Sequence, residues 1–159
     1  MAEDSVDVAV LVERLAAAGS TVAVAESLTG GLLAAAFVDV PGVSAVFRGG
    51  VVAYATDCKH TLLGVDADLL AERGPVDAEV AAAMARGVRE RLETTFGLAA
   101  TGVAGPDPQD GVEPGRVFLA VAGPHEVVGE GLRLSGDRAA VRRGSVVAAL
   151  ALLAAAVTP

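Results

Sequence analysis

The sequence predicts a three-layer α/β/α sandwich with a mixed, mainly parallel sheet of about five strands. Short apolar runs typical of buried strands alternate with longer segments of helical periodicity. The last two strand candidates, 117–121 and 127–134, are joined by a short turn, which predicts one antiparallel strand. The chain has 159 residues, of which 53% are hydrophobic, so we expect a single domain over residues 1–159.

The chain is predicted to begin with an amphipathic helix followed by a buried strand. Apolar residues recur at the helical i, i+3, i+4, i+7 spacing over residues 8–15, with Ser5 as a candidate N-cap and Gly19 at the end. The apolar run 22–25 is short and contains β-branched residues, as a strand buried on both faces does. Residues 30–38 then form the next helix.

The alternation continues to the end of the chain. Asp77 and Asp137 are the expected N-caps of the two longest helices. The expected elements are a strand at 50–55, helices at 57–63, 66–72 and 78–92, strands at 98–101, 117–121 and 127–134, and a helix from 138 to about 157. Segment 102–115 contains four glycines and three prolines, so we expect a loop there, the best candidate for a mobile lid.

Composition and charge exclude several classes of partner. Twenty acidic against twelve basic residues give a formal net charge of -8, and only 3% of residues are aromatic, which argues against binding to nucleic acid. The apolar run 146–157 is about half the roughly 20 residues of a membrane span, so we expect a core helix and no membrane partner. A secretory signal begins with positively charged residues, whereas this chain has the acidic Glu3 and Asp4 there. The single cysteine, Cys58, cannot form a disulfide within the chain, which fits a reducing compartment. We therefore expect a cytoplasmic protein.

Three polar stretches follow the predicted parallel strands, where ligands of open α/β sheets bind. They are "ESLTGG" (26–31), "YATDCK" (54–59) and "TGVAGPD" (101–107). In the first, Ser27 is followed by a threonine and two glycines that let a ligand approach the backbone. Ser27 could be a nucleophile, or the helix start could hold an anion with its free N–H groups. Alternatively, Ser27 or Thr29 only caps the helix.

A serine nucleophile requires a base, and a lysine is the best candidate. His125 lies in a predicted turn and His60 on a predicted surface helix, so neither histidine is favoured. Lys59 follows the second strand, and an ammonium removed from water loses its proton more easily. Tyr54, five residues earlier, could relay a proton or polarise that lysine. The alternative is that Lys59 is a solvated surface residue.

Arg138 and Arg142 are four residues apart, which places them on one face of the last helix. Together they could clamp a phosphate or a carboxylate, or they could be two surface arginines. The acidic residues of the loop, Asp107, Asp110 and Glu113, lack the spacing of a metal site, so no metal or cofactor is expected.

Four blocks in this order resemble the CinA C-terminal domain family, whose enzymes are nicotinamide-nucleotide amidohydrolases. They are "AESLTGG" (25–31), "FRGGVVAYATDCK" (47–59), "TGVAGPD" (101–107) and "SGDRAAVRR" (135–143). The resemblance covers residues 8–157 and is to the form that consists of this domain alone; other members carry an additional N-terminal domain. It implies a three-layer sandwich with a mixed five-stranded sheet, no metal, and a homo-oligomer.

The resemblance also implies an activity and a site. The activity is hydrolysis of the carboxamide of nicotinamide mononucleotide to nicotinate mononucleotide and ammonia. Ser27 matches the family's nucleophile, Lys59 its lysine and Tyr54 its tyrosine, and Thr101 lines the same pocket. The N–H groups near residues 29–31 (Thr29, Gly30, Gly31) are expected to stabilise an oxyanion. Phosphate is expected at Arg138 or Arg142 and at the turn with Gly102 and Gly105, with Arg48 a weaker candidate.

Two departures from the family pattern leave other functions open. Ala55 and Thr56 stand where members usually have serine or threonine and then asparagine, and the loop after Pro106 lacks the familiar glycine pair. One alternative is a non-catalytic module that binds a nucleotide or a partner, and another is hydrolysis of a different amide.

Overall fold

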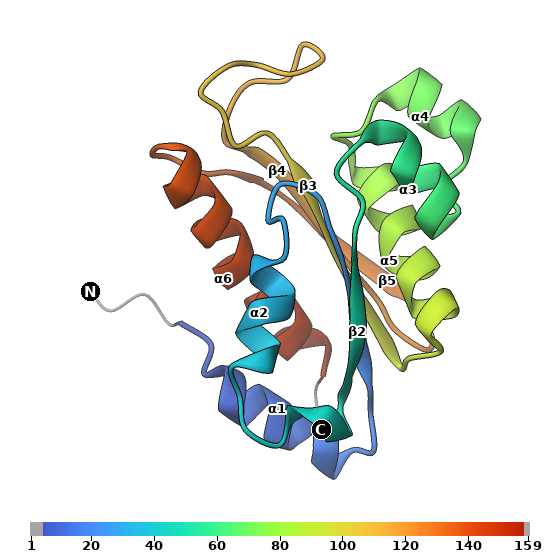
Figure 1. The fold of residues 1–159 in the computed structure, drawn as a ribbon, viewed down its shortest axis with the longest axis vertical. Helices are drawn as coiled ribbons and strands as arrows, with labels where there is room; N and C mark the ends of the chain where they lie inside the picture. The colour runs from blue at the N-terminus through green and yellow to red at the C-terminus, as the bar shows by residue number, and fades with distance from the viewer. Residues whose placement is uncertain (1–4, 158–159) are drawn as a thin grey trace.

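The computed structural model describes residues 5–157. They form a five-stranded sheet with helices on both faces, so the predicted three-layer α/β architecture is confirmed (Figure 1). The strands are β1 (Val22–Glu26), β2 (Phe47–Val52), β3 (Phe96–Gly102), β4 (Arg116–Ala122) and β5 (Val127–Arg133). The helices are α1 (Val8–Ala17), α2 (Leu32–Val38), α3 (Thr56–Leu63), α4 (Ala67–Arg73), α5 (Ala78–Leu92) and α6 (Arg138–Ala156), with a short 3-10 helix, η1 (Val43–Ala45).

The strand order is β2-β1-β3-β4-β5. β1 pairs in parallel with both β2 and β3, whereas β4 is antiparallel to both β3 and β5. Four strands therefore run in one direction and β4 runs against them, which confirms the prediction of a mixed sheet with one antiparallel strand. The carboxyl ends of β2, β1 and β3 consequently meet at one edge of the sheet.

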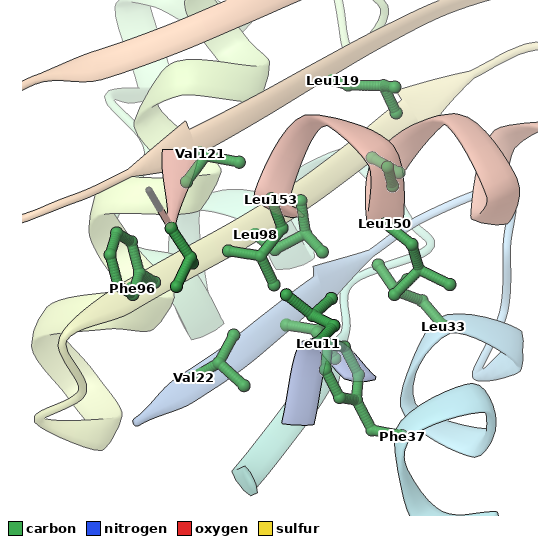
Figure 2. Packing of buried hydrophobic residues seen from close by; sticks show 14 of the residues in the cluster. Leu11, Val22, Leu33, Phe37, Phe96, Leu98, Leu119, Val121, Leu150 and Leu153 are labelled. Atoms are coloured by element: carbon green, nitrogen blue, oxygen red, sulfur yellow. The ribbon is translucent and has the colours of Figure 1, made fainter. Parts of the chain in front are cut away.

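Each face of the sheet carries its own group of helices and its own apolar core. α1, α2 and α6 cover one face, and α3, α4 and α5 cover the other (Figure 1). Side chains alternate along a strand, so Val22 and Val24 of β1 point into the first core, and Ala23 and Ala25 into the second. Figure 2 shows the first core, where Leu153 of α6 lies beside Leu98 of β3.

The structure confirms two predicted helix caps and corrects a third. Asp77 accepts hydrogen bonds from the N–H groups of Glu79 and Val80 at the start of α5, and Asp137 caps α6. For α1 the cap is Asp7, not Ser5, because the helix begins at Val8 and the Asp7 carboxylate accepts from the amides of the first turn. A cap must directly precede the first helical residue.

Two predicted boundaries also differ from the structure. β2 covers Phe47–Val52, not 50–55, because it is an edge strand that contains two glycines, which weaken the sequence signal for a strand. α2 begins at Leu32, not at residue 30. Gly30 and Gly31 have positive φ angles of 56° and 104°, so they belong to the turn after β1.

Within residues 5–157, α6 is the one helix whose length and composition would let it cross a membrane. One of its faces is buried, with Val141, Ala149, Leu150 and Leu153 in the core beneath the sheet. This face confirms the expectation of a core helix. Its N-terminal turns carry the two arginines of the candidate site.

α3 lies with its backbone directly against α5, at a glycine. A Cβ atom at Gly87 of α5 would lie 1.9 Å from the carbonyl oxygen of Leu63, the last residue of α3. Contacts this short are sterically forbidden, so only glycine allows the observed distance between the two helices. This packing fixes the position of α3, which also carries Lys59.

We predict that Gly87→Ala destabilises the protein by about 1–3 kcal/mol, because α3 must move away from α5. Alanine in a helix interior would otherwise stabilise by roughly 0.5–1 kcal/mol. Denaturant unfolding measures the difference. The control is Gly144→Ala in the interior of α6, whose new Cβ would lie 3.2 Å from the flexible end of Leu134, so this variant should be neutral or stabilised by up to about 1 kcal/mol. A Gly87→Ala midpoint at or above the wild-type value would refute this account.

Candidate active site

The three polar stretches meet at the carboxyl edge of the parallel strands, at the top of Figure 1. Ser27 directly follows β1, Lys59 lies in α3 after β2, and Thr101 is the penultimate residue of β3. All three line one cavity of about 290 Å³, together with Tyr54 and with Arg138 of α6. The structure therefore brings together residues that the sequence separates by more than a hundred positions.

The side chains of Lys59 and Ser27 are in direct contact. Lys59 Nζ lies 3.1 Å from Ser27 Oγ, within hydrogen-bonding distance. Two backbone carbonyls complete the surroundings of the amine: Nζ donates to Ala53 O at 2.8 Å and to Tyr54 O at 3.4 Å. The serine hydroxyl and the lysine amine thus have the separation that a nucleophile and its base require.

Lys59 is held in surroundings that favour its neutral form. Only 1% of the residue is exposed, and within residues 5–157 no carboxylate lies within ion-pair distance of it. Burial therefore lowers the pKa of Lys59 from 10.5 to about 8, against a smaller raising effect of the neighbouring Cys58. At neutral pH a fraction on the order of a tenth of the lysine is unprotonated and can accept a proton.

Neither Ser27 nor Thr29 caps α2, which corrects one of the interpretations left open by the sequence. The N-cap position is Gly31, which makes no side-chain cap bond, and within the described residues Thr29 Oγ1 has no hydrogen-bond partner. The buried carboxylate of Glu26 takes the role instead: it accepts hydrogen bonds from Leu33 N at 2.8 Å and Ala34 N at 3.1 Å. The Ser27 hydroxyl is therefore available to Lys59.

Glu26 also means that the start of α2 offers fewer free N–H groups than the sequence suggested. Two of its first amides already bind the Glu26 carboxylate, which lies at the positive end of the helix dipole. Sequence reasoning missed this residue. The signal was present, because Glu26 is the one charged residue in the buried strand "VAVAE", and a buried charge requires partners.

The predicted anion-binding glycines lie beside the cavity and do not line it. Leu28 belongs to the lining, whereas Thr29, Gly30 and Gly31 do not. The N–H of Gly30 donates to Ser27 O at 3.1 Å and so closes the turn. Contact of these three residues with a ligand stays a prediction.

The two arginines of α6 contact different walls of the site. Arg138 lines the cavity, where Nη1 donates to Gly105 O at 2.6 Å and Nη2 to the Tyr54 hydroxyl at 3.3 Å. Arg142 lies outside the cavity lining and donates to the carbonyls of Leu28 and Thr29. The arrangement does not form a joint clamp around one anion, because each guanidinium is bound to a separate loop.

Two further predicted residues have clear positions. The hydroxyl of Thr101 donates to Pro75 O at 2.7 Å and so fixes the loop before α5 to the end of β3. Arg48 does not belong to the site: it lies near the start of β2, outside the cavity, and its Nε donates to Leu92 O. Ligands of open α/β sheets bind at the carboxyl ends of the strands, which is the opposite end of β2 from Arg48.

The rest of the lining comes from the long loop and from the segment before α5. Gly102 and Gly105 line the cavity as expected, and Pro75, Val76 and Gln109 complete parts of the wall that sequence analysis did not identify. These three residues carry no distinctive motif. Neither His60 nor His125 lines the cavity, which agrees with the choice of a lysine as the base.

Comparisons with known proteins match this chain to one family. Residues 5–157 match the family model described as the CinA C-terminal domain. The chain is 52% identical over 152 residues to a CinA-like protein of Frankia casuarinae, and 49% identical over 138 residues to one of Gloeobacter violaceus. These alignments cover 96% and 85% of this chain but only 35% and 32% of the two relatives, so it spans about a third of their length.

Solved structures agree in fold over almost the whole chain. The competence/damage inducible protein of Agrobacterium tumefaciens superposes with a TM-score of 0.87 at 34% identity and 98% coverage of both chains. A CinA superfamily protein of Enterobacter cloacae gives a TM-score of 0.92 at 28% identity, with 99% of this chain and 96% of that chain covered. On the match of the family model and the identity to these relatives, this chain belongs to the CinA C-terminal domain family.

Proposed function

We propose that this protein hydrolyses the carboxamide of nicotinamide mononucleotide, giving nicotinate mononucleotide and ammonia. The observation that carries the proposal is the 3.1 Å contact between Ser27 Oγ and the buried amine of Lys59. Membership of the CinA family supports the choice of substrate. The cavity of about 290 Å³ lies just below the roughly 300–1,000 Å³ of drug-sized sites, so it favours a ligand no larger than one mononucleotide.

The reaction proceeds in two halves through an ester on Ser27. Neutral Lys59 accepts the hydroxyl proton of Ser27 while Oγ attacks the carboxamide carbon. The lysine then gives this proton to the amide nitrogen, the C–N bond breaks, and ammonia leaves. In the second half a water molecule loses a proton to Lys59 and attacks the ester, and Ser27 regains its proton as nicotinate mononucleotide is released.

Tyr54 acts in this scheme through two different parts. Its backbone carbonyl contacts Lys59 Nζ, so it orients the base. The residue as a whole is 61% exposed, and its hydroxyl accepts a hydrogen bond from Arg138, so the side chain serves there as a wall for the substrate. Arg138, at the same mouth, supplies the positive charge for the phosphate of the nucleotide.

Neither departure from the family pattern touches Ser27 or Lys59, although the second one, the loop after Pro106, lines the cavity with Asp107, Pro108 and Gln109. Ala55 and Thr56 are both exposed and belong to the start of α3, and neither lines the cavity. The contact between Ser27 and Lys59 is intact beside them. This favours a catalytic protein over a non-catalytic nucleotide-binding or partner module of the same fold.

We predict that purified protein releases ammonia from nicotinamide mononucleotide, and that Ser27→Ala lowers kcat by about a thousandfold or more. The control is Ser145→Ala, another buried serine, whose hydroxyl donates to Val141 O within α6. It should keep wild-type turnover. Nucleotide binding without product would indicate the binding module, and ammonia from other amides alone would indicate a different substrate. Unchanged turnover by Ser27→Ala would exclude the nucleophile.

We predict that kcat/KM rises with pH and levels off, with a midpoint near pH 8. The neutral lysine is the active form, and the pKa of Lys59 is about 8, so activity increases as the proton is lost. Lys59→Arg keeps the group protonated and should be inactive across the same range. A profile that is flat between pH 6.5 and 9.5 would contradict a lysine base.

The charge state of Lys59 also has a measurable effect on stability without any substrate. Its pKa is lowered from 10.5 to about 8 on folding, so between these pH values the unfolded chain binds more protons than the folded one. Stability therefore rises with pH in this window, by a contribution on the order of 3 kcal/mol.

Lys59→Met lacks this titration, so the free energy of unfolding of the wild type should increase relative to that of Lys59→Met from pH 8 to pH 10.5. Denaturant unfolding of both proteins at matched pH measures the change, and subtraction removes the titrations that they share. A difference that stays constant with pH would mean that folding leaves the pKa of Lys59 unperturbed.

A further inference from the structure

Arg142 makes the main contact to the middle of the turn that carries Ser27. Its Nε donates to Leu28 O at 2.9 Å and its Nη2 to Thr29 O at 3.1 Å, so one guanidinium binds two consecutive carbonyls. The donors of an arginine form a rigid planar fork, and two bonds to it fix direction as well as distance. The segment after β1 is therefore held by a side chain from the second turn of α6.

Gly30 provides the space for this contact. A Cβ atom at position 30 would lie 3.3 Å from Arg142 Nη2, and the residue has a positive φ of 56°, which side chains disfavour. The glycine that the sequence suggested for close approach of a ligand is thus in contact with the arginine. The absence of a side chain at Gly30 thus leaves room for the Arg142 guanidinium, although 112 residues separate the two positions.

The ends of the turn are held by other contacts, but its middle is not. Ser27 N donates to Ala100 O in β3, and Glu26 binds the first amides of α2. Within residues 5–157, the N–H groups of Leu28 and Thr29 make no hydrogen bond, and Thr29 Oγ1 has no partner. Arg142 is the side chain that fixes the peptide planes of residues 28 and 29.

The turn reaches the cavity through its first two residues. Ser27 and Leu28 line the cavity, whereas Thr29 is fully buried and Arg142 lies outside the lining. Arg142 therefore holds the turn from the side opposite to the one that a substrate would contact.

We propose that Arg142 is a positioning residue: by holding the carbonyls of Leu28 and Thr29, it fixes the turn that carries Ser27 and so keeps the Ser27 hydroxyl against the amine of Lys59. This role rests on the proposed acyl transfer at Ser27. It differs from the role expected from sequence, in which Arg142 would itself bind the substrate anion. A positioning role affects kcat, whereas an anion ligand would affect KM.

The experiment uses a probe that carries no phosphate and does not depend on the natural substrate. p-Nitrophenyl acetate transfers its acetyl group to Ser27 Oγ, p-nitrophenolate leaves, and Lys59 takes the serine proton. The burst of p-nitrophenolate and the mass of the acetylated protein report the rate, with Ser27→Ala as the blank. The same proteins are assayed for kcat and KM with nicotinamide mononucleotide.

Arg142→Ala should lower both the acetylation rate and kcat by about a hundredfold, because the Ser27 hydroxyl is then no longer held in place against Lys59, with KM changed by less than about threefold. Arg142→Lys restores one of the two carbonyl contacts and should recover about a tenth of the wild-type rate. The matched control is Arg143→Ala, an exposed neighbour on α6, which should behave as the wild type. The pH midpoint near 8 should be unchanged in every active variant, because Lys59 is untouched.

Several outcomes would overturn the proposal. A higher KM with unchanged kcat and unchanged acetylation would make Arg142 an anion ligand. Equal acetylation of Arg142→Ala and the wild type would remove any positioning role. If Arg142→Ala does not unfold cooperatively, the test uses Arg142→Lys alone. A lowered acetylation rate and kcat in that variant would support the positioning role, and wild-type values would refute it. Wild-type protein that is acetylated at Ser27 but inactive on the nucleotide would refute only the proposed substrate, and the absence of Ser27 acetylation would refute both proposals.

Discussion

A buried lysine amine that contacts a serine hydroxyl is the interaction on which the site depends. Removing an ammonium from water is costly, and Lys59 has no carboxylate partner within the described chain to offset that cost. Its acceptors are instead the Ser27 hydroxyl and the carbonyls of Ala53 and Tyr54. Neutral acceptors stabilise the amine without restoring its usual pKa, as a carboxylate would. The same burial that lowers stability at neutral pH therefore lowers the pKa of Lys59 to about 8, as the proposed role of a base requires.

The charged groups around this pair mostly bind the protein's own backbone. Glu26 binds the amides at the start of α2, and Arg142 binds two carbonyls of the turn after β1. Of the arginines in residues 5–157, Arg138 is the one that lines the cavity itself. In a chain with a net charge of -8, a negatively charged substrate thus has to be recognised by a local contact rather than by the overall field.

Most of the strands and helices, and the residues that meet in the cavity, could be predicted from the sequence because two rules are strong. Apolar periodicity identified the strands and helices, and the rule that ligands bind at the carboxyl ends of parallel strands brought Ser27, Lys59 and Thr101 together. What failed depends on contacts between distant residues. The lone charge of Glu26 in a buried strand signals that it needs partners, but not that these are the first amides of α2. No local pattern shows that Arg142 binds the turn while Arg138 lines the cavity. The β2 boundary failed because an edge strand with two glycines has little apolar alternation.

The substitution at position 55 illustrates how tertiary packing compensates for a missing local signal. Ala55 is the N-cap of α3 and makes no side-chain cap bond, whereas serine or threonine would be a good capping residue there. α3 must nevertheless hold Lys59 within 3.1 Å of Ser27. The negative charge of Asp57 in the first turn interacts favourably with the positive end of the helix dipole. At the other end, the close contact of Leu63 with Gly87 fixes α3 against α5. Lys59 is thus held beside Ser27 by a helix that begins without a side-chain cap and whose last residue packs directly on α5.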